Sequence, residues 1–565
     1  MTLITLDFAK GMTNRYGDSD IPKGYVRDAK DILIGNTGQL RFPRWGKTQV
    51  YAGNCHSIFE SSTGTFFVED GDLKKLNNDY TATTIRVSVG DSRMYYAELV
   101  FTLFFCNEDI TGIYTSDTGA VEWGCARVSS QPDSTVLTTG DMYAGDYRYA
   151  ITWIGSLDEG GTGNSEIVTV PEGGSIVLSN FPTAPDYVTA FAVWVTSVNG
   201  KDLLLYGEYP IDTTTVTITR LTADGVEPTQ FLETQFAYPP LPKGTITIHQ
   251  GRMYYALGNF VYWTLPFHYG QQVTGSYWNF DSEVQYIASM PGVMYVATLA
   301  KHYKITNIDE DSPVQIEELV DVGGVKGSVC IDKNGIYFYS MTGRGIVRGS
   351  PEKLEELTYE ALAMPSYSSG TMTMLELDGL RQLLFVGEDA IRNPQEHSDY
   401  TQLTPTVPIA WIINMDTGAI TRATFTANRL TPTYCSDATG ICIIGGNTDN
   451  STTIYGSLRT GLSDFKEEAG QDRTYDPNAI KHLSDAYIVM KGGKMVLTTT
   501  CDDGALIYST IATTRMEQIK IDRLARGTRS YLWQIGIDNL SSGTTVVNAV
   551  KIELQSLTRR SGRAR

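Results

Sequence analysis

Several patterns that define common classes of enzyme and metal protein do not occur in this chain of 565 residues. It has no CxxC pair, no HxH or HExxH, no GxSxG, no Walker loop, and no GxGxxG between a strand and a helix. Zinc-ligand spacing is also absent. These absences argue against zinc sites, metalloproteases, α/β-hydrolases and nucleotide-binding domains. We therefore expect a protein that is not an enzyme, with no catalytic residues, no metal and no cofactor.

Cysteine and histidine are scarce and scattered. The seven cysteines are an odd number, so we expect free thiols in a protein made in a reducing cytosol. A disulfide between Cys435 and Cys442, across a hairpin, is the alternative. The six histidines lie too far apart to suggest a ligand set, and each is expected to be packed or solvated: His56, His249, His268, His302, His397 and His482.

Long apolar runs are missing as well. No stretch of eighteen apolar residues exists, so no membrane span is expected. The first seven residues have no basic region followed by an apolar one, and we expect no secretory signal. Positive charge is in deficit, because 45 Lys and Arg face 64 Asp and Glu, for a net charge of −19. A protein that binds nucleic acid tightly needs an excess of Lys and Arg instead, because these residues bind the phosphates.

Glycine (54) and tyrosine (33) are abundant and favour strands and tight turns. The stretch 251–263 reads as two strands joined by the turn Gly258-Asn259. Similar units follow at 292–305 and 334–348, and 93–98 repeats the letters of 252–257 almost completely. A hairpin unit that recurs at about forty residues is typical of a propeller blade. We predict an all-β fold built on a β-propeller of about six or seven blades.

From Gly140 the residue pattern of the chain changes, and we place the boundaries of an inserted domain at residues 131 and 222. Between these points, five or six strands resemble a small β-sandwich of fibronectin type III character, inserted into the propeller. Residues 466–477 read as a linker, and arginines 559, 560, 563 and 565 form a basic tail. The predicted organisation is an N-terminal arm (1–50), first blades (51–130), the inserted β-sandwich (131–222), remaining blades (223–465), and a C-terminal β-sandwich or closing module with the tail (478–565).

Acidic residues often come in sequence pairs, and a glycosidase needs two carboxylates about 5–10 Å apart. Neighbours in loops seldom meet that requirement, so we interpret them as solvated loop charge. A calcium site at 309–311 is the weaker reading, because the regular loop spacing is missing. The pairs are Glu108 and Asp109, Asp158 and Glu159, Asp309 to Asp311, Glu317 and Glu318, Glu355 and Glu356, and Glu467 and Glu468.

Residues 115–123 resemble the Asp-box of sialidase propellers with one residue too many. That motif caps a hairpin and marks a blade rather than an active site. The dense aromatics of the central region suggest either a sugar-stacking platform or packing between sheets, and we favour packing. They are Tyr254, Tyr255, Tyr262, Trp263, Phe267, Tyr269, Tyr277, Trp278 and Phe280.

Loose motifs along nearly the whole chain resemble structural tail proteins of short-tailed bacteriophages, above all their nozzle or hub proteins. They include Met12-Thr13-Asn14, Arg44-Trp45-Gly46, 145–152 with Ser165-Glu166, 251–256 with 261–264, and 531–535 with Asp538-Asn539. The resemblance implies a propeller-based virion protein of the viral tail, made in the host cytoplasm. It also implies a homohexameric ring at the distal tail that closes and then conducts the genome during ejection.

Such a ring contacts other tail proteins, an adaptor and fibres, and double-stranded DNA passes through without specific binding. The acidic balance fits a channel wall that repels DNA, since a basic wall would hold it. Two alternatives remain open from the sequence. One is a propeller protein of the virion that depolymerises host glycan, and the other is a receptor-binding module with an aromatic pocket.

Overall fold

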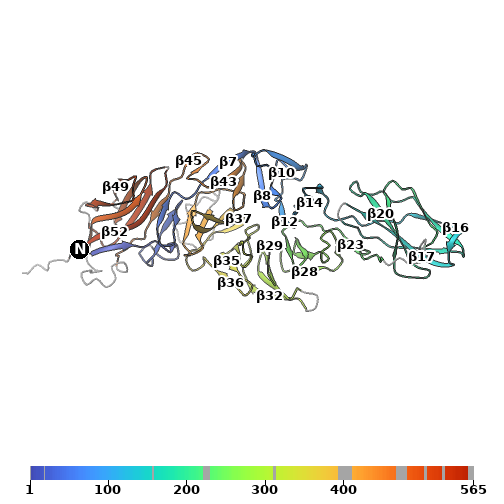
Figure 1. Cartoon of the computed structure of the whole chain (residues 1–565). Coiled ribbons are helices and arrows are strands. Elements are labelled where there is room, and N and C mark those ends of the chain that lie inside the picture. Colours follow the sequence, from blue (N-terminus) through green and yellow to red (C-terminus); the bar gives the residue numbers. More distant parts are fainter. Residues whose placement is uncertain are drawn as a thin grey trace, which may run out of the picture.

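The computed structural model describes residues 2–17, 19–155, 158–220, 230–308, 313–391, 410–465, 480–501, 506–524, 529–541 and 543–557. Every regular element in these ranges is a β-strand, which confirms the predicted all-β class. The predicted linker at 466–477, the acidic triplet at 309–311 and the basic tail lie outside them. Figure 1 shows three bodies in a row, with a ring of sheets in the middle.

Within the described residues, seven sets of four antiparallel strands make up the ring. Five of them are separate sheets, and the last two are parts of larger sheets of eleven and six strands. The first four are β8 (Cys55–Ser61), β9 (Gly64–Glu69), β10 (Asp72–Leu76) and β11 (Ala82–Arg86); β12 (Tyr95–Leu99), β13 (Thr102–Cys106), β14 (Thr111–Thr115) and β15 (Gly119–Val121); β24 (Ile246–His249), β25 (Arg252–Leu257), β26 (Phe260–Trp263) and β28 (Tyr277–Asn279); and β29 (Val284–Met290), β30 (Val293–Thr298), β31 (His302–Thr306) and β32 (Gln315–Val320).

The other three sheets complete the circle. They are β33 (Cys330–Ile331), β34 (Phe338–Thr342), β35 (Gly345–Gly349) and β36 (Leu354–Glu356); β37 (Ser366–Leu377), β38 (Leu380–Ile391), β39 (Ala410–Asn414) and β40 (Ile420–Ala423); and β41 (Arg429–Leu430), β42 (Tyr434–Asp437), β43 (Gly440–Ile444) and β7 (Lys47–Ala52).

The first strands of these sheets line the centre of the ring. They touch in order from β8 through β12 and β24 to β29, and from β33 through β37 and β41 back to β8. The fourth and fifth sheets are joined by a hydrogen bond of 2.6 Å between Tyr286 and Ser340, both buried. This cyclic order is that of a β-propeller.

The hairpin pattern of the sequence follows from local turn chemistry. Strands β25 and β26 pair across Gly258-Asn259, where Gly258 takes a φ of 61° in the turn. The repeated letters at 93–97 and 252–256 are out of phase, however. Residues 252–256 lie on the second strand of their sheet, whereas 95–97 lie on the first strand and Arg93 precedes it. The same short sequence therefore occupies different strand positions in the two sheets.

The last sheet of the ring is closed by the N-terminal part of the chain. Strand β7 pairs antiparallel with β43, with Thr48 opposite Ile443 and Gln49 opposite Cys442. On the other side of β43, Cys435 lies directly opposite Cys442, and all seven cysteines are free thiols. Strands β41 to β43 come from near residue 440, so closure joins segments almost four hundred residues apart.

The N-terminal and C-terminal segments, which we predicted as separate parts, form one body. One of its sheets follows the order β5 (Leu33–Ile34), β6 (Leu40–Phe42), β52 (Thr545–Leu557), β47 (Ile480–Lys491) and β50 (Glu517–Asp522), with β1 (Thr2–Leu6) paired to β52. Residues from both ends of the chain share its core, including Ile4, Phe42 and Ile552. The predicted N-terminal arm (1–50) is therefore divided: its first strands belong to this body, whereas β7, which begins at Lys47, belongs to the ring.

The second sheet of this body continues directly from the ring. Beyond β40 come β4 (Asp28–Lys30), β46 (Ser457–Arg459), β51 (Trp533–Asn539), β48 (Lys494–Cys501) and β49 (Leu506–Ala512). Strand β2 (Gly11–Met12) also pairs with β40, and β3 (Tyr25–Val26) pairs with β2. Strand β4 therefore bridges a propeller sheet to the terminal body. The short strands β44 (Thr448–Asp449) and β45 (Thr452–Thr453) extend the closing sheet beyond β7.

The third body is a two-sheet sandwich at the opposite end of the molecule (Figure 1). Its sheets have the orders β16 (Asp133–Met142), β19 (Gly174–Ser179), β22 (Thr215–Ile218) and β18 (Glu166–Val170), β17 (Gly145–Ile154), β20 (Ala190–Val195), β21 (Leu204–Pro210). A core that includes Trp153, Ile176 and Phe191 fills the space between them. A small pair, β23 (Ala237–Tyr238) with β27 (Gln272–Val273), lies where the chain returns to the ring.

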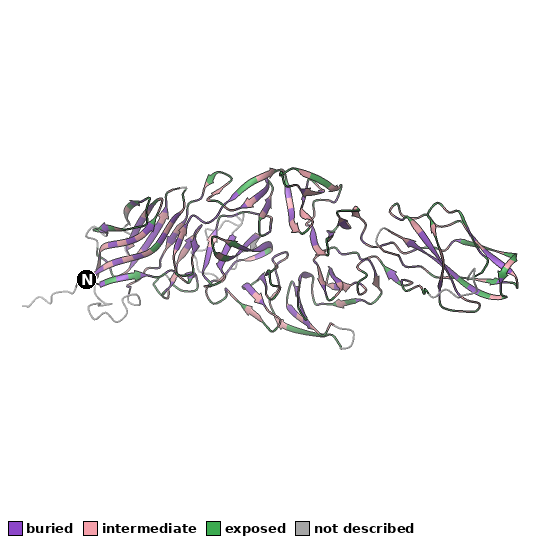
Figure 2. Cartoon of the chain, in the orientation of Figure 1, coloured by how far each residue is buried: buried purple, intermediate pink, exposed green. Residues whose placement is uncertain are grey.

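Figure 2 shows how burial follows these layers, with buried residues along the strands of the ring and of both sandwiches. Arg44 is a fully buried cation among them. The Arg44 side chain has no exposed surface and bonds Asp31 through Nε at 2.8 Å and Asp449 through Nη2 at 2.7 Å. Asp31 also accepts hydrogen bonds from the Thr424 backbone and hydroxyl. These contacts tie the N-terminal segment to the sixth and seventh sheets.

Replacing Asp31 tests this anchor. Asp31→Ala leaves the Arg44 guanidinium buried without its main counter-ion, and we expect a loss of about 3–5 kcal/mol in unfolding free energy. Urea denaturation followed by tryptophan fluorescence measures it. The matched control is Asp378→Ala, which removes the partner of Arg41 at a site where Asp378 is 56% exposed, and should cost about 0–1 kcal/mol. Equal effects of the two variants would contradict the anchoring role.

Candidate functional site: the cavity at the centre of the ring

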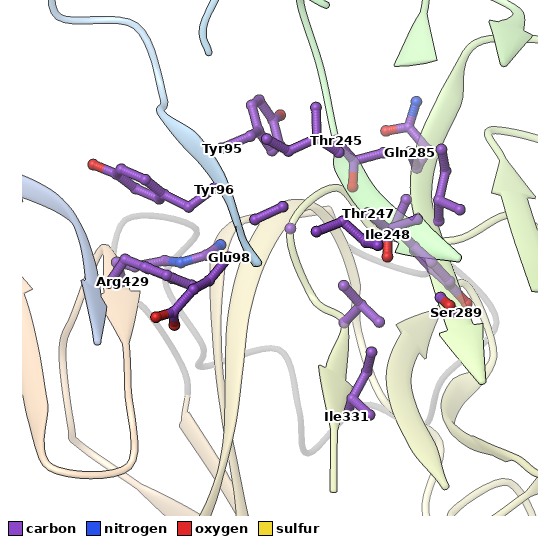
Figure 3. Close-up of a pocket in the computed structure, with 17 residues that line it drawn as sticks. Tyr95, Tyr96, Glu98, Thr245, Thr247, Ile248, Gln285, Ser289, Ile331 and Arg429 are labelled. Atoms are coloured by element: carbon purple, nitrogen blue, oxygen red, sulfur yellow. The ribbon is translucent and has the colours of Figure 1, made fainter. Parts of the chain in front are cut away.

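A cavity of about 430 Å³ lies where the first strands of the sheets meet. That volume is in the range of small-molecule sites. Figure 3 shows Tyr95, Tyr96 and Glu98 from β12 on one side and Gln285 and Ser289 from β29 on another. Apolar groups complete the wall: Phe59, Ile246, Ile248, Ile287, Val329 and Ile331.

Arg93 reaches across the ring beside this cavity. It precedes β12 of the second sheet, and its Nη2 donates to the carbonyl oxygens of Gly370 at 2.9 Å and Gly327 at 3.4 Å. These two glycines belong to the sixth sheet and to the approach to the fifth, on the opposite side of the circle. Gly327 has a φ of 74°, and a Cβ there would lie 2.2 Å from Cζ of Arg93. Only glycine leaves room for this guanidinium.

Arg429, at the start of β41, is the second guanidinium of the site (Figure 3). Burial, and next the charge of Arg93, lower its pKa to about 10, so it stays protonated at neutral pH. Within the described residues, its side chain makes no hydrogen bond and no ion pair. Two like charges thus lie close together with little compensation.

Three polar atoms near the guanidiniums are buried and lack hydrogen-bond partners in the described part of the chain: the Tyr95 hydroxyl, the Tyr96 hydroxyl and Arg93 Nε. Burial raises the pKa of Tyr96, so its hydroxyl remains a neutral donor. The Tyr96 ring stacks on Phe59 at a centroid distance of 5.0 Å. These three atoms have no exposed surface, so they are enclosed by the packing beside the cavity and do not face its free volume.

The one carboxylate among the described residues that line the cavity is Glu98. It already accepts hydrogen bonds from the backbone and hydroxyl of Ser62. On the opposite wall, Ser289 bonds Nδ1 of His249 at 2.9 Å. A glycosidase mechanism needs a second carboxylate, which this wall does not provide.

The paired carboxylates of the sequence lie elsewhere. Glu108, Asp109, Glu317 and Glu318 are exposed, and Glu355 bonds Arg348. In the described ranges no three His, Cys, Asp or Glu side chains are placed to hold a metal, and no helix is long and apolar enough to cross a membrane.

Most of the aromatics of the central region serve packing. Tyr254 and Tyr255 are buried, and Tyr254 stacks on Trp278 at 5.6 Å. Phe267, 76% exposed, is the main departure from that prediction. Among the histidines, His302 is buried between Tyr286 and the Val322 carbonyl, and burial lowers its pKa to about 4. His397 lies outside the described residues.

Sequence reasoning missed both arginines of the cavity. Arg93 and Arg429 are 336 positions apart (429 − 93) and belong to different sheets. One signal was present: Arg93 is the first residue of the repeated letters and lies two residues before the first strand of its sheet. To interpret this signal, one must know which strand of its sheet each repeated segment occupies. The matching letters alone suggest the same strand in both sheets, which is wrong.

A second group of perturbed acids lies at the joint between the inserted sandwich and the ring. Burial raises the pKa of both Asp158 and Glu159, although a hydrogen bond from Thr152 partly opposes this for Glu159. The Glu159 carbonyl accepts a hydrogen bond of 2.9 Å from Gln271 of the ring. This acidic pair is therefore part of the joint rather than solvated loop charge.

No protein-family model matches this chain, and no curated protein matches it. Solved structures give distant likenesses: Hsv2 of Kluyveromyces lactis (7% identity, 67% of this chain and 97% of that one, TM-score 0.25) and exo-beta-1,3-galactanase of Phanerochaete chrysosporium (8%, 83% and 97%, 0.17). PorZ of Porphyromonas gingivalis is a third (11%, 86% and 59%, 0.18). These are β-propeller proteins, and the assignment of that fold to the present chain rests on its own sheet order.

The acids of the joint predict a pH dependence. The folded state raises the pKa of Glu159, so it favours the protonated form and loses stability as pH rises above the usual carboxyl range of about 4–4.5. Glu159→Gln should raise the calorimetric unfolding midpoint of the sandwich at pH 7 and have no effect near pH ~4. Glu317→Gln, at an exposed position, is the control. A midpoint that falls at pH 7 in Glu159→Gln would refute the assignment.

Proposed function

We propose that this chain is a structural protein of a bacteriophage tail, a nozzle or hub subunit whose work is assembly rather than catalysis. Copies join into a ring, with a hexamer as the order that the sequence resemblance implies. The ring contacts an adaptor and fibres, closes the tail, and then lets the genome pass. Each copy carries a seven-bladed propeller with a fibronectin III-like insert and a terminal sandwich.

The observation that carries the proposal is a set of exposed apolar residues with left-handed backbone. Val100 is 78% exposed with a φ of 44°, and Phe101 is 66% exposed with a φ of 62°. Together they form the two-residue turn between β12 and β13, since Leu99 pairs with Thr102. Such turns normally contain Asn-Gly, because β-branched and aromatic residues are strained there.

Two further residues of this kind lie on the neighbouring sheets. Tyr80, between β10 and β11, has a φ of 63°, and Phe267, between β26 and β28, has a φ of 60°. Neighbouring strands alternate in direction, so turns from first to second and from third to fourth strands leave the ring on the same face. Phe267 also donates its backbone N–H to Gly251, in a first-to-second turn, at 2.7 Å.

Each strained residue costs on the order of 1–3 kcal/mol, and strain of this kind persists mainly at functional positions. Exposed apolar groups add the cost of hydrating them. Covering this face in an assembly would offset both costs. We define the tip surface as Tyr80, Val100, Phe101 and Phe267, and propose that it lies in a contact of the tail.

The central cavity of one propeller is too small to conduct DNA, which supports the proposal that the channel forms only when several copies assemble. Arg93 crosses the centre of the ring and the free volume is that of a small molecule, so one propeller offers DNA no passage. A channel formed between several copies is required. The net charge of −19 suits such a channel, because a wall that lacks Lys and Arg does not hold phosphates.

The tip surface predicts opposite effects on folding and assembly. Val100→Asn combined with Phe101→Gly installs the favoured turn sequence and should stabilise the isolated chain by about 1–3 kcal/mol. The same variant should abolish ring particles in negative-stain electron microscopy of the purified protein, and virions carrying it should fail to eject DNA.

The matched control is Leu299→Asn, which makes an exposed apolar residue polar in a turn from a second to a third strand, on the other face. Rings should persist in this variant. Intact rings in the Val100/Phe101 variant would refute the tip surface as an assembly contact. Release of reducing sugar from host polysaccharide by the unaltered protein would favour the glycan-depolymerising alternative.

A further inference from the structure

The inserted sandwich has a cavity of its own, of about 370 Å³, which we call the insert cavity. Its walls are the end of β17, the loop 180–189 between β19 and β20, and the loop 211–214 between β21 and β22. Both loops cross from one sheet of the sandwich to the other. We propose that the insert cavity binds a neutral sugar residue. The inference goes beyond the proposed tail function and does not depend on it.

The indole N–H of Trp153 is the first argument. Trp153 lines the insert cavity and is only 3% exposed. Within the described residues its Nε1 makes no hydrogen bond, and packing does not enclose this atom as it encloses Nε1 of Trp533. Four other buried tryptophans donate to protein oxygens: Trp45, Trp123, Trp194 and Trp411. The Trp153 donor therefore takes its acceptor from the cavity, as a water oxygen in the free protein and a ligand oxygen in the complex.

Acceptors lie on both loops of the insert cavity. Asp212 is the one charged residue among the described residues that line it, and it has no ion pair there. Asn180 donates its Nδ2 to Asp133 at 2.8 Å, which leaves its Oδ1 as an acceptor. Three threonines add hydroxyls, which can donate or accept: Thr183, Thr213 and Thr214.

This set of groups indicates the class of ligand. A carboxylate or phosphate would accept from Trp153, but Asp212 would repel its charge. A simple ammonium would bond Asp212, but it carries no acceptor for the indole N–H. A hydroxyl accepts from the one and donates to the other. A sugar carries several hydroxyls on one compact ring, whereas a peptide offers one N–H and one C=O per residue, so the dense polar lining favours the sugar.

The rest of the wall fits the apolar C–H face of a sugar ring. Phe181 is half-buried and packs on Phe191 at a centroid distance of 4.6 Å, which fixes its position. Ile211 is 41% exposed and adds apolar surface on the second loop. Pro182 and Pro210 restrict φ in or beside the two loops, so the wall is formed before a ligand arrives. The volume lies in the range of small-molecule sites.

Saturation-transfer difference NMR with the full chain tests the site. D-glucose, D-galactose and D-mannose stand for a free sugar, and their methyl glycosides stand for a residue linked in a glycan. At least one of the six should bind at millimolar concentration, and the tighter of the two kinds identifies the source. The best binder should exceed sodium D-glucuronate, butylammonium chloride and N-acetylalanine N-methylamide about tenfold in affinity, since each of these lacks a partner for one wall group or adds a repelled charge.

Variants assign the binding to the insert cavity. Asp212→Ala, at an exposed position, should fold normally and weaken the sugar affinity about tenfold, because it removes the charged acceptor. Trp153→Phe removes the indole N–H, keeps an aromatic ring in the core, and should have a similar effect. The matched control is Asp141→Ala, which removes an exposed acid at the other end of the same sandwich and should leave the affinity unchanged.

Three results would overturn the proposal. One is the absence of a transfer signal from all six sugars. Another is a sugar affinity that Asp212→Ala leaves unchanged, since the sugar would then lie elsewhere on the chain. The third is tighter binding of N-acetylalanine N-methylamide or butylammonium than of any sugar, which would make the insert cavity a site for a peptide or an amine.

Discussion

Closure of the ring by β7 is the constraint on which the rest of the structure depends. A sheet of three strands at β41 to β43 would leave an open edge, and an open edge pairs with other chains. Strand β7 covers that edge, and it reaches its place because Arg44 is bonded to Asp31 and Asp449 nearby. The residues before β7 then belong to the terminal body through β1 and β4. One N-terminal segment therefore closes the ring and joins it to its neighbour.

Local physics explains what could be predicted from the sequence. The hairpin β25–β26 and its turn at Gly258-Asn259 involve residues close in the chain, and alternation of apolar residues reveals them. Long-range pairs carry no such signal. Nothing near Asp28 indicates that it pairs with Arg459, and nothing near Thr2 indicates its place opposite Leu554. The predicted N-terminal arm and C-terminal module were therefore separated in sequence although they form one folded body.

The residues that line the cavity were also hard to predict from the sequence, because they come from distant parts of the chain. Tyr95 and Tyr96 were recognised as part of a strand, but their role depends on which strand of the sheet they occupy. In the third sheet the corresponding letters, Tyr254 and Tyr255, lie one strand outward, although all four tyrosines pack between sheets. Arg429 stands in a two-residue strand without any motif. A cavity wall assembled from several sheets is a property of the ring, and it becomes visible only once the ring is closed.

The tip surface and the cavity make different demands on one scaffold. The cavity needs fixed positions, because Arg93 spans the ring to Gly370 at 2.9 Å and a small displacement of either sheet would break that bond. The tip surface needs left-handed turns that the isolated hairpin would not prefer. Both are met when the sheets are locked by packing from either side, as at Phe66 and Tyr114 or at Tyr286 and Phe338. A closed ring gives every sheet a neighbour on both sides. Packing against these neighbours maintains the strained turn at Val100 and Phe101, and β7 in turn keeps the ring closed.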